Sequence, residues 1–355
     1  MRLLSFIKRF TLVEMLFVIA IVGILAGILL PSVMKSRERA KSVRWLTFNE
    51  QWNRDGDTVL NFNFEYTGYT VKYNGVVFPG IRNGAVGCGV SGFEPPLYDG
   101  ILVGDPEFKK KCGRWGTNNA LQFDGVNDFV LIPGTKALDF DPDKDDFTFV
   151  VWFNADNFNS STKTFFSKAD LPAGSQYDAS LEDKKISVGL GASSTSAEYS
   201  GFKAGRWMNL VIRCNMGKSA IFINGTMIGG DSGAAFLSRL PDTSMLAMTK
   251  FPFEMFLTAQ NSNANSNAGG NSGGNSGGNS GGNSGGGGTT TQPVSNANFV
   301  MGAYGISGAS EISGTTIKVQ NTSYFFQGMF DEVIVIKRAL SNSEIEGIYK
   351  MGNPY

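Results

Sequence analysis

A long apolar run near the N-terminus constrains the possible folds of this chain more than any other feature. The run KRFTLVEMLFVIAIVGILAGILLP, from Lys8 to Pro31, holds one carboxylate, Glu14. At about 1.5 Å per residue, a helix from Phe10 to Met34 would cross the roughly 30 Å hydrocarbon core of a bilayer. An ionised Glu in lipid costs several kcal/mol unless it lies at the interface or meets a positive partner. The run therefore predicts a transmembrane helix in which Glu14 needs an explanation.

Three interpretations of this run compete. A cleaved secretory signal explains the basic start, but the run is long for such a signal and no small-x-small cleavage site follows it. A plain signal anchor explains the length and leaves Glu14 incidental. The third interpretation rests on a resemblance, and it accounts for both the length and the carboxylate.

The segment FTLVEMLFVIAIVGILAGILLP closely resembles the prepilin-type cleavage and methylation segment of type IV pilins and type II secretion pseudopilins. The resemblance implies that a prepilin peptidase cuts between Arg9 and Phe10, so that residues 1–9 form a leader, and that the new amine is methylated. Glu14 would then pair with the terminal ammonium of Phe10 in a neighbouring pilin-like subunit during assembly. Arg9 departs from the family, which usually has Gly before the cut, and Pro31 stands where the family tolerates a helix kink.

Flanking charges do not fix the orientation of the helix. Three basic residues precede the run and five follow it: Arg2, Lys8, Arg9, then Lys35, Arg37, Arg39, Lys41 and Arg44. The positive-inside rule alone could therefore favour the opposite topology. The pilin resemblance places the C-terminal domain outside the cytoplasmic membrane, in the periplasm or beyond the cell. Residues 10–48 then form the membrane helix and its stalk, in which KSRERAKSVRWL continues the helix as a solvated, charged segment.

The composition excludes several functions. With 31 basic and 31 acidic residues the formal net charge is zero, which gives no support to a nucleic-acid partner. The chain has no histidine, so Ser-His-Asp catalysis, Cys-His catalysis and His-ligated metal sites are excluded.

The rest of the chain has the pattern of an all-β protein. Short apolar runs with period-two alternation are separated by Gly and Asn, which is typical of strands in an antiparallel sandwich. FTFVVWF is apolar on both faces and predicts a central strand, and Asn224-Gly225 predicts a tight hairpin. The predicted strands are VLNFNFEY, NALQFDG, DFVLIPG, DFTFVVWF, KISVGLG, RWMNLVIRC, SAIFING and MFDEVIVI.

The order of these segments resembles the laminin-G-like, concanavalin A-like jelly roll, over roughly residues 61–350. Ser341 with Glu344 three residues later predicts the capped start of a short final helix. The matching blocks are NALQFDGVNDFVLIP, FTFVVWF, GRWMNLVIRCNMGKSAIFINGTMIGG and GMFDEVIVIKRALSNSEIEGIY.

A Gly/Asn/Ser-rich insert covers residues 259–298. It lacks the apolar side chains needed to offset chain entropy, so it predicts a flexible coil. Because the last strands follow it, we expect an exposed loop within one sandwich rather than a boundary between domains.

The three cysteines leave two interpretations open. Cys88 and Cys112 lie in glycine-rich loop sequence, whereas Cys214 lies in the strand pattern LVIRC. An exported domain would permit a Cys88–Cys112 disulfide with Cys214 as a buried thiol. The alternative is three unrelated small hydrophobic side chains.

Acidic side chains raise the questions of catalysis and of metal binding. The clusters DFDPDKDD and FDEV lack the Glu-x-Asp-x-x-Glu arrangement of glucanases with this fold, so we expect a binding protein rather than an enzyme. Four carboxylates near strand ends, Asp124, Asp128, Asp331 and Glu332, could instead hold calcium. The competing interpretation is that Asp124 satisfies its own turn and Asp331 accepts backbone hydrogen bonds.

Together these features predict a membrane-anchored, pilin-like or pseudopilin-like protein that displays a laminin-G-like domain for recognition of a glycan or a protein. The alternative is a purely structural filament or pseudopilus subunit without a ligand.

Overall fold

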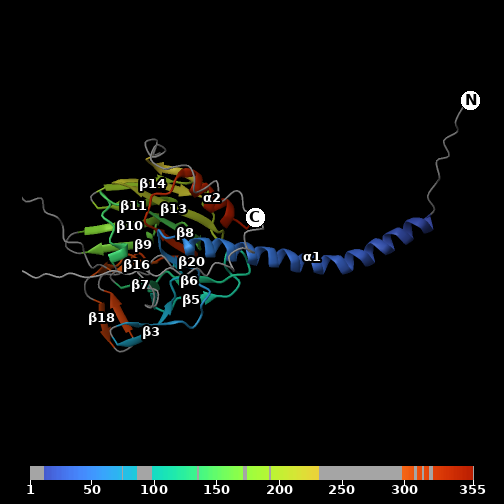
Figure 1. Ribbon diagram of the computed structural model, residues 1–355, viewed down its shortest axis with the longest axis horizontal. Coiled ribbons are helices and arrows are strands. Elements are labelled where there is room, and N and C mark those ends of the chain that lie inside the picture. Colours follow the sequence, from blue (N-terminus) through green and yellow to red (C-terminus); the bar gives the residue numbers. More distant parts are fainter. Residues whose placement is uncertain are drawn as a thin grey trace, which may run out of the picture. The chain divides into compact units, whose positions relative to one another are not determined.

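The computed structural model describes residues 12–354 except 74, 86–97, 134–135, 171–173, 192, 232–297, 308–309, 314–315 and 320–322. Within these residues, a long N-terminal helix precedes a mostly antiparallel sandwich of two β-sheets (Figure 1). The predicted fold class is confirmed. The predicted cleavage residues Arg9 and Phe10, Cys88, and the insert as far as residue 297 lie outside the described residues.

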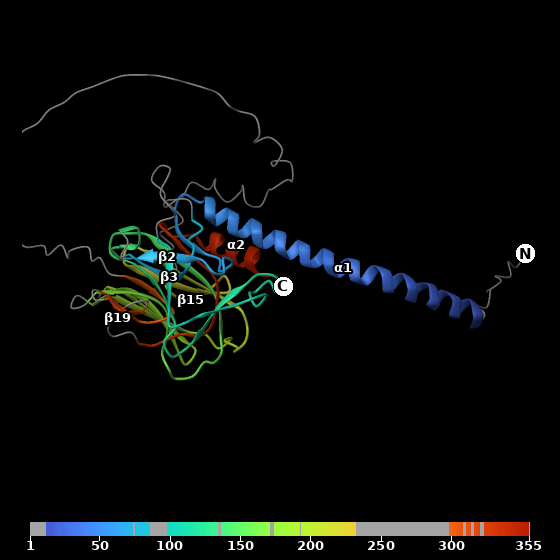
Figure 2. The same ribbon diagram turned by 90° about the horizontal axis from the view of Figure 1, so that it is seen from below.

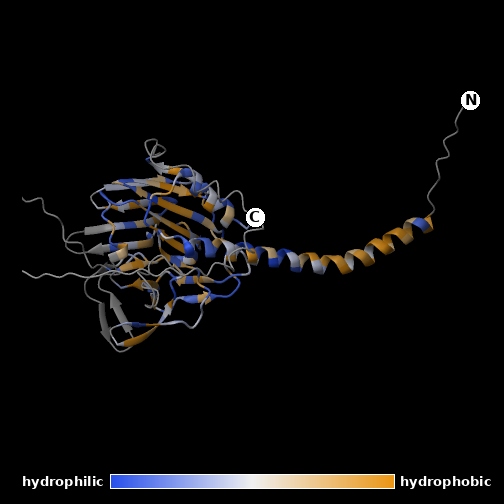
Figure 3. Ribbon diagram, viewed as in Figure 1, coloured by the Kyte–Doolittle hydropathy of each residue, from blue (hydrophilic) through white to orange (hydrophobic). Residues whose placement is uncertain are grey.

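The N-terminal helix α1 (Leu12–Arg54) has two unlike halves. Its first half is long and apolar enough to cross a membrane, and none of that window is buried in the protein. Figure 3 colours this half mostly as hydrophobic, whereas polar and apolar residues alternate in the second half. Near its C-terminal end, Phe48, Asn49 and Trp52 are buried. Their i, i+1 and i+4 spacing puts them on one face of the helix.

The first sheet has eight strands among the described residues, and β8 and β20 lie at its centre. Two strands share one edge of β20: β6 pairs with its first part and β1 with its last part. The strands are β1 (Thr58–Phe62), β5 (Glu107–Lys109), β6 (Ala120–Asp124), β8 (Phe147–Ala155), β13 (Met208–Asn215), β14 (Lys218–Ile223), β15 (Thr226–Gly230) and β20 (Gln327–Ile336).

The second sheet has ten strands among the described residues. A separate hairpin is formed by β18 (Ser310–Ser313) and β19 (Thr316–Val319), and a short 3-10 helix covers Lys136–Leu138. The strands of the second sheet are β2 (Thr70–Tyr73), β3 (Val76–Ile81), β4 (Gly100–Val103), β7 (Phe129–Ile132), β9 (Lys163–Asp170), β10 (Gly174–Glu182), β11 (Lys185–Leu190), β12 (Ser193–Glu198), β16 (Phe299–Met301) and β17 (Ile306–Ser307).

The main core lies between the sheets and is rich in phenylalanine. Phe149 of β8 stacks on Phe166 of β9 with ring centroids 4.2 Å apart, and Tyr177 of β10 lies 5.3 Å from Phe149. Each fully buried aromatic side chain contributes about 1.5–3 kcal/mol through the hydrophobic effect. Every residue of β8 is buried, which confirms the predicted central strand.

A second core covers the outer face of the first sheet. Phe48 and Trp52 of α1 pack there with Val150, Phe222 and Ile345. The last of these belongs to the C-terminal helix α2 (Asn342–Gly352), which Figure 2 shows beside the C-terminal part of α1. The outer face of this sheet is therefore covered from both ends of the sequence.

Local sequence signals set several of these elements. Asn224 and Gly225 have φ angles of 52° and 75°, so both occupy the left-handed region that a type I′ hairpin requires. The hairpin predicted there joins β14 to β15. The predicted capping box is also confirmed, because the Ser341 side chain accepts from Glu344 N while Glu344 accepts from Ser341 N. All eight predicted strands are present, as β1, β6, β7, β8, β11, β13, β14 and β20.

Candidate functional site

A β-bulge in the middle of β20 places two carboxylates beneath α1. The register of β20 against β8 shifts between Asp331 and Val333, and Glu332 has a φ of 42°. The bulge lies between the part of β20 that pairs with β6 and the part that pairs with β1. Such a bulge redirects side chains locally. Asp331 and Glu332 are both fully buried.

Arg114, in the loop between β5 and β6, supplies a cation that faces both buried carboxylates. Its Nη1 atom lies 3.3 Å from Asp331 Oδ2 and also forms an ion pair with Glu332 Oε2. The Arg114 backbone N–H donates to Asp331 Oδ2 at 2.7 Å, and Asn118 Nδ2 donates to Asp331 Oδ1 at 2.8 Å. Burial lowers the pKa of Arg114 to about 10, against the opposing effect of Asp331, so the guanidinium stays charged at neutral pH. Burial also raises the pKa of Asp331, while Arg114 and Asn118 oppose that shift.

Helix α1 supplies the remaining donors to Glu332. Trp45 Nε1 donates to Glu332 Oε1 at 2.5 Å, and Asn49 Nδ2 donates to the same oxygen at 3.0 Å. The Arg114 guanidinium also lies 5.1 Å from the ring centroid of Phe48 and 4.4 Å from that of Trp152. Desolvated cation–π contacts of this kind contribute up to about 2 kcal/mol.

The C-terminal end of α2 joins the same cluster. Arg114 Nε donates to Gly352 O at 2.8 Å, and Arg44 Nη2 donates to Lys350 O at 2.6 Å. These carbonyls belong to the last turn of α2, where helix geometry leaves acceptors without partners and favours positive charge. A side chain at Gly352 would put its Cβ 2.7 Å from Trp152 Cζ2, so this close approach requires glycine.

We call this cluster the junction and define it as Trp45, Asn49, Arg114, Asn118, Asp331, Glu332 and Gly352. It connects α1, the β5–β6 loop, β20 and α2. Removing one partner of a buried ion pair costs about 3–5 kcal/mol, because the other charge stays buried without compensation. The junction therefore fixes α1 to the sandwich. Its carboxylates are closed to solvent, so they do not form the accessible pair that glycoside hydrolysis requires.

The other two predicted carboxylates are Asp124, at the end of β6, and Asp128, in the turn between β6 and β7. Asp128 Oδ2 accepts from Asp124 N at 2.9 Å, and Asp124 Oδ1 accepts from Val126 N at 2.7 Å and from Asn127 N at 3.2 Å. Burial raises the pKa of Asp128 to about 6, because the charged form loses hydration there.

The structure does not bring the four predicted calcium ligands together. Asp124 lies opposite Gln327 in the ladder, four residues along β20 from Asp331, which is about 13 Å at the usual strand rise. Among the described residues, no group of three or more His, Cys, Asp or Glu side chains could hold a metal ion. Asp124 and Asp331 instead accept the hydrogen bonds that the competing interpretation expected. Calcium binding stays a prediction.

The structure describes only part of the predicted processing, assembly and disulfide residues. Glu14 lies in the first turn of α1 and is exposed. Cys112 is exposed and Cys214 is buried, as expected for the latter. Because Cys88, Arg9 and Phe10 lie outside the described residues, the disulfide and the cleavage stay predictions.

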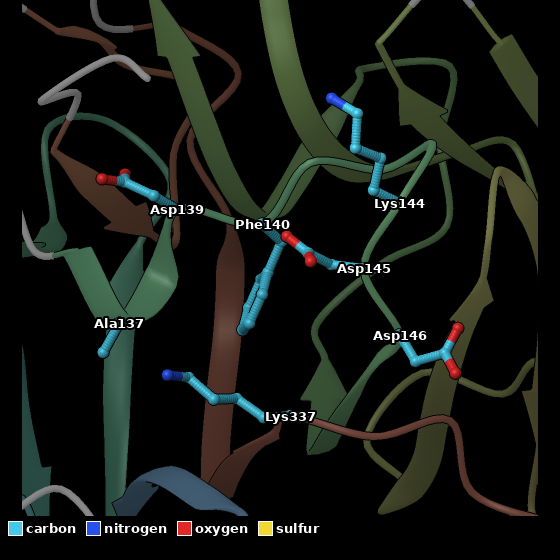
Figure 4. A pocket seen from close by; sticks show the side chains of 7 residues that line it. All are labelled: Ala137, Asp139, Phe140, Lys144, Asp145, Asp146 and Lys337. Carbon is cyan, nitrogen blue, oxygen red and sulfur yellow. The ribbon is translucent and has the colours of Figure 1, made fainter.

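A polar cleft of about 270 Å³ lies at one end of the sandwich, where β8 begins and β20 ends. Figure 4 shows its lining side chains, with Asp145 and Lys337 on different segments near the Phe140 ring. Lys168 is buried and pairs with Asp139, and burial lowers the pKa of Lys168 while Asp139 opposes that shift. The lining residues are Ala137, Asp139, Phe140, Lys144, Asp145, Asp146 and Lys337.

The cleft lies at the end of β20 that is farther from the apolar half of α1. Helix α1 and β20 run in the same direction, because Trp45 contacts Glu332 whereas Asp55, just after α1, pairs with Arg338 at 3.6 Å. The apolar half precedes Trp45 along the helix. Lys337 and the cleft lie beyond the opposite, C-terminal end of β20.

Comparisons with known proteins agree with the architecture. A family model described as the concanavalin A-like lectin/glucanases superfamily, of laminin G type, matches residues 124–249. No protein with a curated description matches the chain by sequence. The chain therefore contains a lectin-like, concanavalin A-like jelly roll preceded by an apolar helix.

The solved structures that the chain matches share little sequence with it. The receptor binding domain of botulinum neurotoxin C/D mosaic serotype is 10% identical with a TM-score of 0.42, and the match covers 83% of this chain and 51% of that one. The binding domain of Paraclostridial Mosquitocidal Protein 1 is 11% identical with a TM-score of 0.44, and the match covers 82% of this chain and 52% of that one. A Trypanosoma rangeli sialidase is 11% identical with a TM-score of 0.43, and the match covers 90% of this chain and 38% of that one. The chain thus spans about half the length of the toxin binding domains.

Proposed function

We propose that this chain is a membrane-anchored, pilin-like or pseudopilin-like protein that displays a lectin-like sandwich outside the cytoplasmic membrane. One observation carries the proposal: α1 is a single helix whose first half exposes its apolar side chains while its last turns are fixed to the sandwich. An apolar helix of this length is stable in a bilayer or among other apolar helices. Because the last turns of α1 are packed on the sandwich, the helix and the sandwich are attached directly rather than through a flexible linker.

The sequence resemblance supports the pilin-like part of this proposal. The segment beginning at Phe10 carries the prepilin-type pattern, and Glu14 lies on the exposed half of α1. A neighbouring subunit's terminal ammonium could therefore approach Glu14 without displacing the sandwich. The partners on this view are a prepilin peptidase and other pilin-like subunits.

Mass spectrometry of the N-terminus tests this proposal. When the chain is expressed with a prepilin peptidase, we expect mature chains that begin at Phe10. The matched variant Arg9→Gly restores the usual family residue and should be cut at least as completely. Recovery of both chains only from Met1 would contradict the proposal, and cutting of the variant alone would show that Arg9 blocks processing.

For the sandwich, we propose recognition of a glycan or a protein rather than hydrolysis. The polar cleft supports this role, because carboxylates and ammonium groups together match the donors and acceptors of sugar hydroxyls. It also lies at the end of β20 away from the apolar half of α1, which suits a displayed site. A purely structural subunit without a ligand remains the second candidate.

A glycan array probed with the full chain in detergent micelles separates these candidates. We expect binding that Asp145→Asn and Lys337→Gln each weaken by about tenfold, since each removes a charge-assisted hydrogen bond. The control Lys203→Gln changes an exposed lysine outside the cleft and should bind normally. Absence of binding to glycans and to candidate proteins would favour the structural role.

A further inference from the structure

The part of α1 that directly follows its apolar half concentrates positive charge. Residues 35–44 contain five basic residues and one acidic residue, a net charge of +4, so the rest of this neutral chain carries −4. Lys35, Arg37 and Arg39 are exposed, and among the described residues they form no ion pair. We call Lys35, Arg37, Arg39 and Lys41 the basic collar.

The basic collar surrounds the helix rather than marking one face. At about 100° per residue, Lys35 and Arg39 lie within roughly 40° of each other, whereas Arg37 and Lys41 lie on the opposite side. A flat protein surface would contact only one of these sides at a time. A layer of anionic groups that encloses the helix would contact both.

When the apolar half of α1 is in a bilayer, the lipid head groups form such a layer around the collar, because the collar directly follows the apolar half. Leu12–Met34 spans about 35 Å as a helix, which is slightly more than the roughly 30 Å hydrocarbon core. Lys35 follows at once, and Lys41 lies about 10 Å farther along the axis. Lys and Arg side chains near a membrane helix end extend their charged groups to the head-group level.

We infer that the basic collar binds the phosphate groups of anionic phospholipids in the leaflet on the sandwich side of the membrane. This inference rests on the proposed membrane anchoring and holds for either orientation of the helix. Basic residues next to a membrane span interact favourably with anionic lipids, and the effect falls off within about 10 Å. The collar would thereby set the depth of the helix and hold the junction just outside the head groups.

Lipid enrichment around the full chain tests this inference. The chain is reconstituted in vesicles of equal phosphatidylcholine and phosphatidylglycerol, extracted gently, and analysed by native mass spectrometry for retained lipids. We expect phosphatidylglycerol to exceed phosphatidylcholine about fivefold. The triple variant Lys35→Gln, Arg37→Gln, Arg39→Gln should lose this preference. The matched triple variant Lys184→Gln, Lys185→Gln, Lys203→Gln removes the same charge from exposed sandwich positions and should keep it.

The outcomes separate the inference from the proposed function. If the wild-type chain sediments with the vesicles but shows no phosphatidylglycerol preference, the inference is overturned and membrane anchoring stands. If the collar variant keeps the preference, the collar does not bind the lipid. If collar-dependent cross-links to a second copy form without lipid enrichment, the collar contacts protein instead. If the wild-type chain does not sediment with any vesicle, the proposed anchoring fails, and the inference fails with it.

Discussion

The two halves of α1 belong to one helix, with Pro31 inside it, but they differ in what covers their side chains. Phe17 in the first half is 67% exposed, whereas Phe48 in the second half is 2% exposed. The hydrophobic effect acts on both, but only the second half finds a covering surface within the described part of the chain. Anchoring in a membrane and attachment of the sandwich are therefore separate properties of one helix, and substitutions can change one without the other.

The largest expected effect comes from breaking the junction. Arg114→Met keeps most of the side-chain volume but leaves Asp331 and Glu332 buried without their cation. We expect the free energy of unfolding to fall by about 3–5 kcal/mol. The measurement is denaturant unfolding of the full chain in detergent micelles, followed by tryptophan fluorescence.

An exposed ion pair on the same helix provides the control for Arg114→Met. Glu50 pairs with Arg54 at 2.6 Å on the surface of α1, so Glu50→Gln should cost less than about 1 kcal/mol. Equal unfolding midpoints for Arg114→Met and the wild type would mean that the junction does not hold α1 to the sandwich.

A matched pair of phenylalanine truncations tests the comparison between the halves directly. Phe48→Ala removes a buried ring from the second half of α1, where it packs on the sandwich, and should lower the free energy of unfolding by about 3 kcal/mol. Phe17→Ala removes an exposed ring from the apolar half and should leave the unfolding midpoint unchanged. Similar losses from both variants would show that the two halves are not independent.

The sequence predicted much of the sandwich because strand signals are local. The segment FTFVVWF, apolar on both faces, forms the fully buried β8. Asn224 and Gly225 supply the positive φ angles of the hairpin between β14 and β15. Strands with weaker alternation were missed. In β10, GSQYDASLE is mostly polar, so only its place between β9 and β11 makes it a strand.

The junction could not be predicted in the same way. Arg114 and Asp331 are 217 residues apart, and no local pattern links them. A partial signal was present, because Trp45, Phe48, Asn49 and Trp52 follow i, i+3, i+4 and i+7 spacing. The predicted solvated segment KSRERAKSVRWL is mostly exposed, but the helix continues beyond it to Arg54, and Phe48 and Trp52 in those last turns are buried. For the predicted calcium ligands, the sequence could not show that Asp124 pairs opposite Gln327, four residues along β20 from Asp331.

A smaller effect concerns the dependence of stability on pH, through Asp128 in the turn between β6 and β7. The pKa of Asp128 is raised to about 6, compared with about 4 in an unfolded chain. Between these values the folded state holds a proton on Asp128 that the unfolded state has lost, so the contribution of Asp128 to stability is greatest at the acidic end and is lost as pH rises through 6. Asp128→Asn should reduce the loss of stability between pH 4 and 7 by about 1 kcal/mol, because partial solvent access weakens the effect.

Unfolding midpoints between pH 4 and 7 measure this slope. Glu198→Gln, at an exposed position of β12, serves as the control and should keep the wild-type slope. Asp331 and Glu65 also have raised pKa values, so Asp128→Asn should reduce the slope rather than abolish it. An unchanged slope in Asp128→Asn would show that this carboxyl does not govern the pH response.

The smallest expected effect on stability, and the sharpest separation of the two halves, comes from Glu14→Ala. Glu14 is exposed on the apolar half, so its loss should leave the unfolding midpoint of the sandwich unchanged. It should also ease insertion, because a carboxylate no longer enters lipid. If Glu14 pairs with the Phe10 ammonium of a neighbouring subunit, assembly should nevertheless fall, as measured by cross-linking of mature chains in membranes. The variant Glu14→Asp keeps the charge on a shorter side chain and should retain part of the assembly. Full assembly of Glu14→Ala would remove the proposed role, whereas loss of assembly together with a lower unfolding midpoint would mean that the apolar half also supports the sandwich.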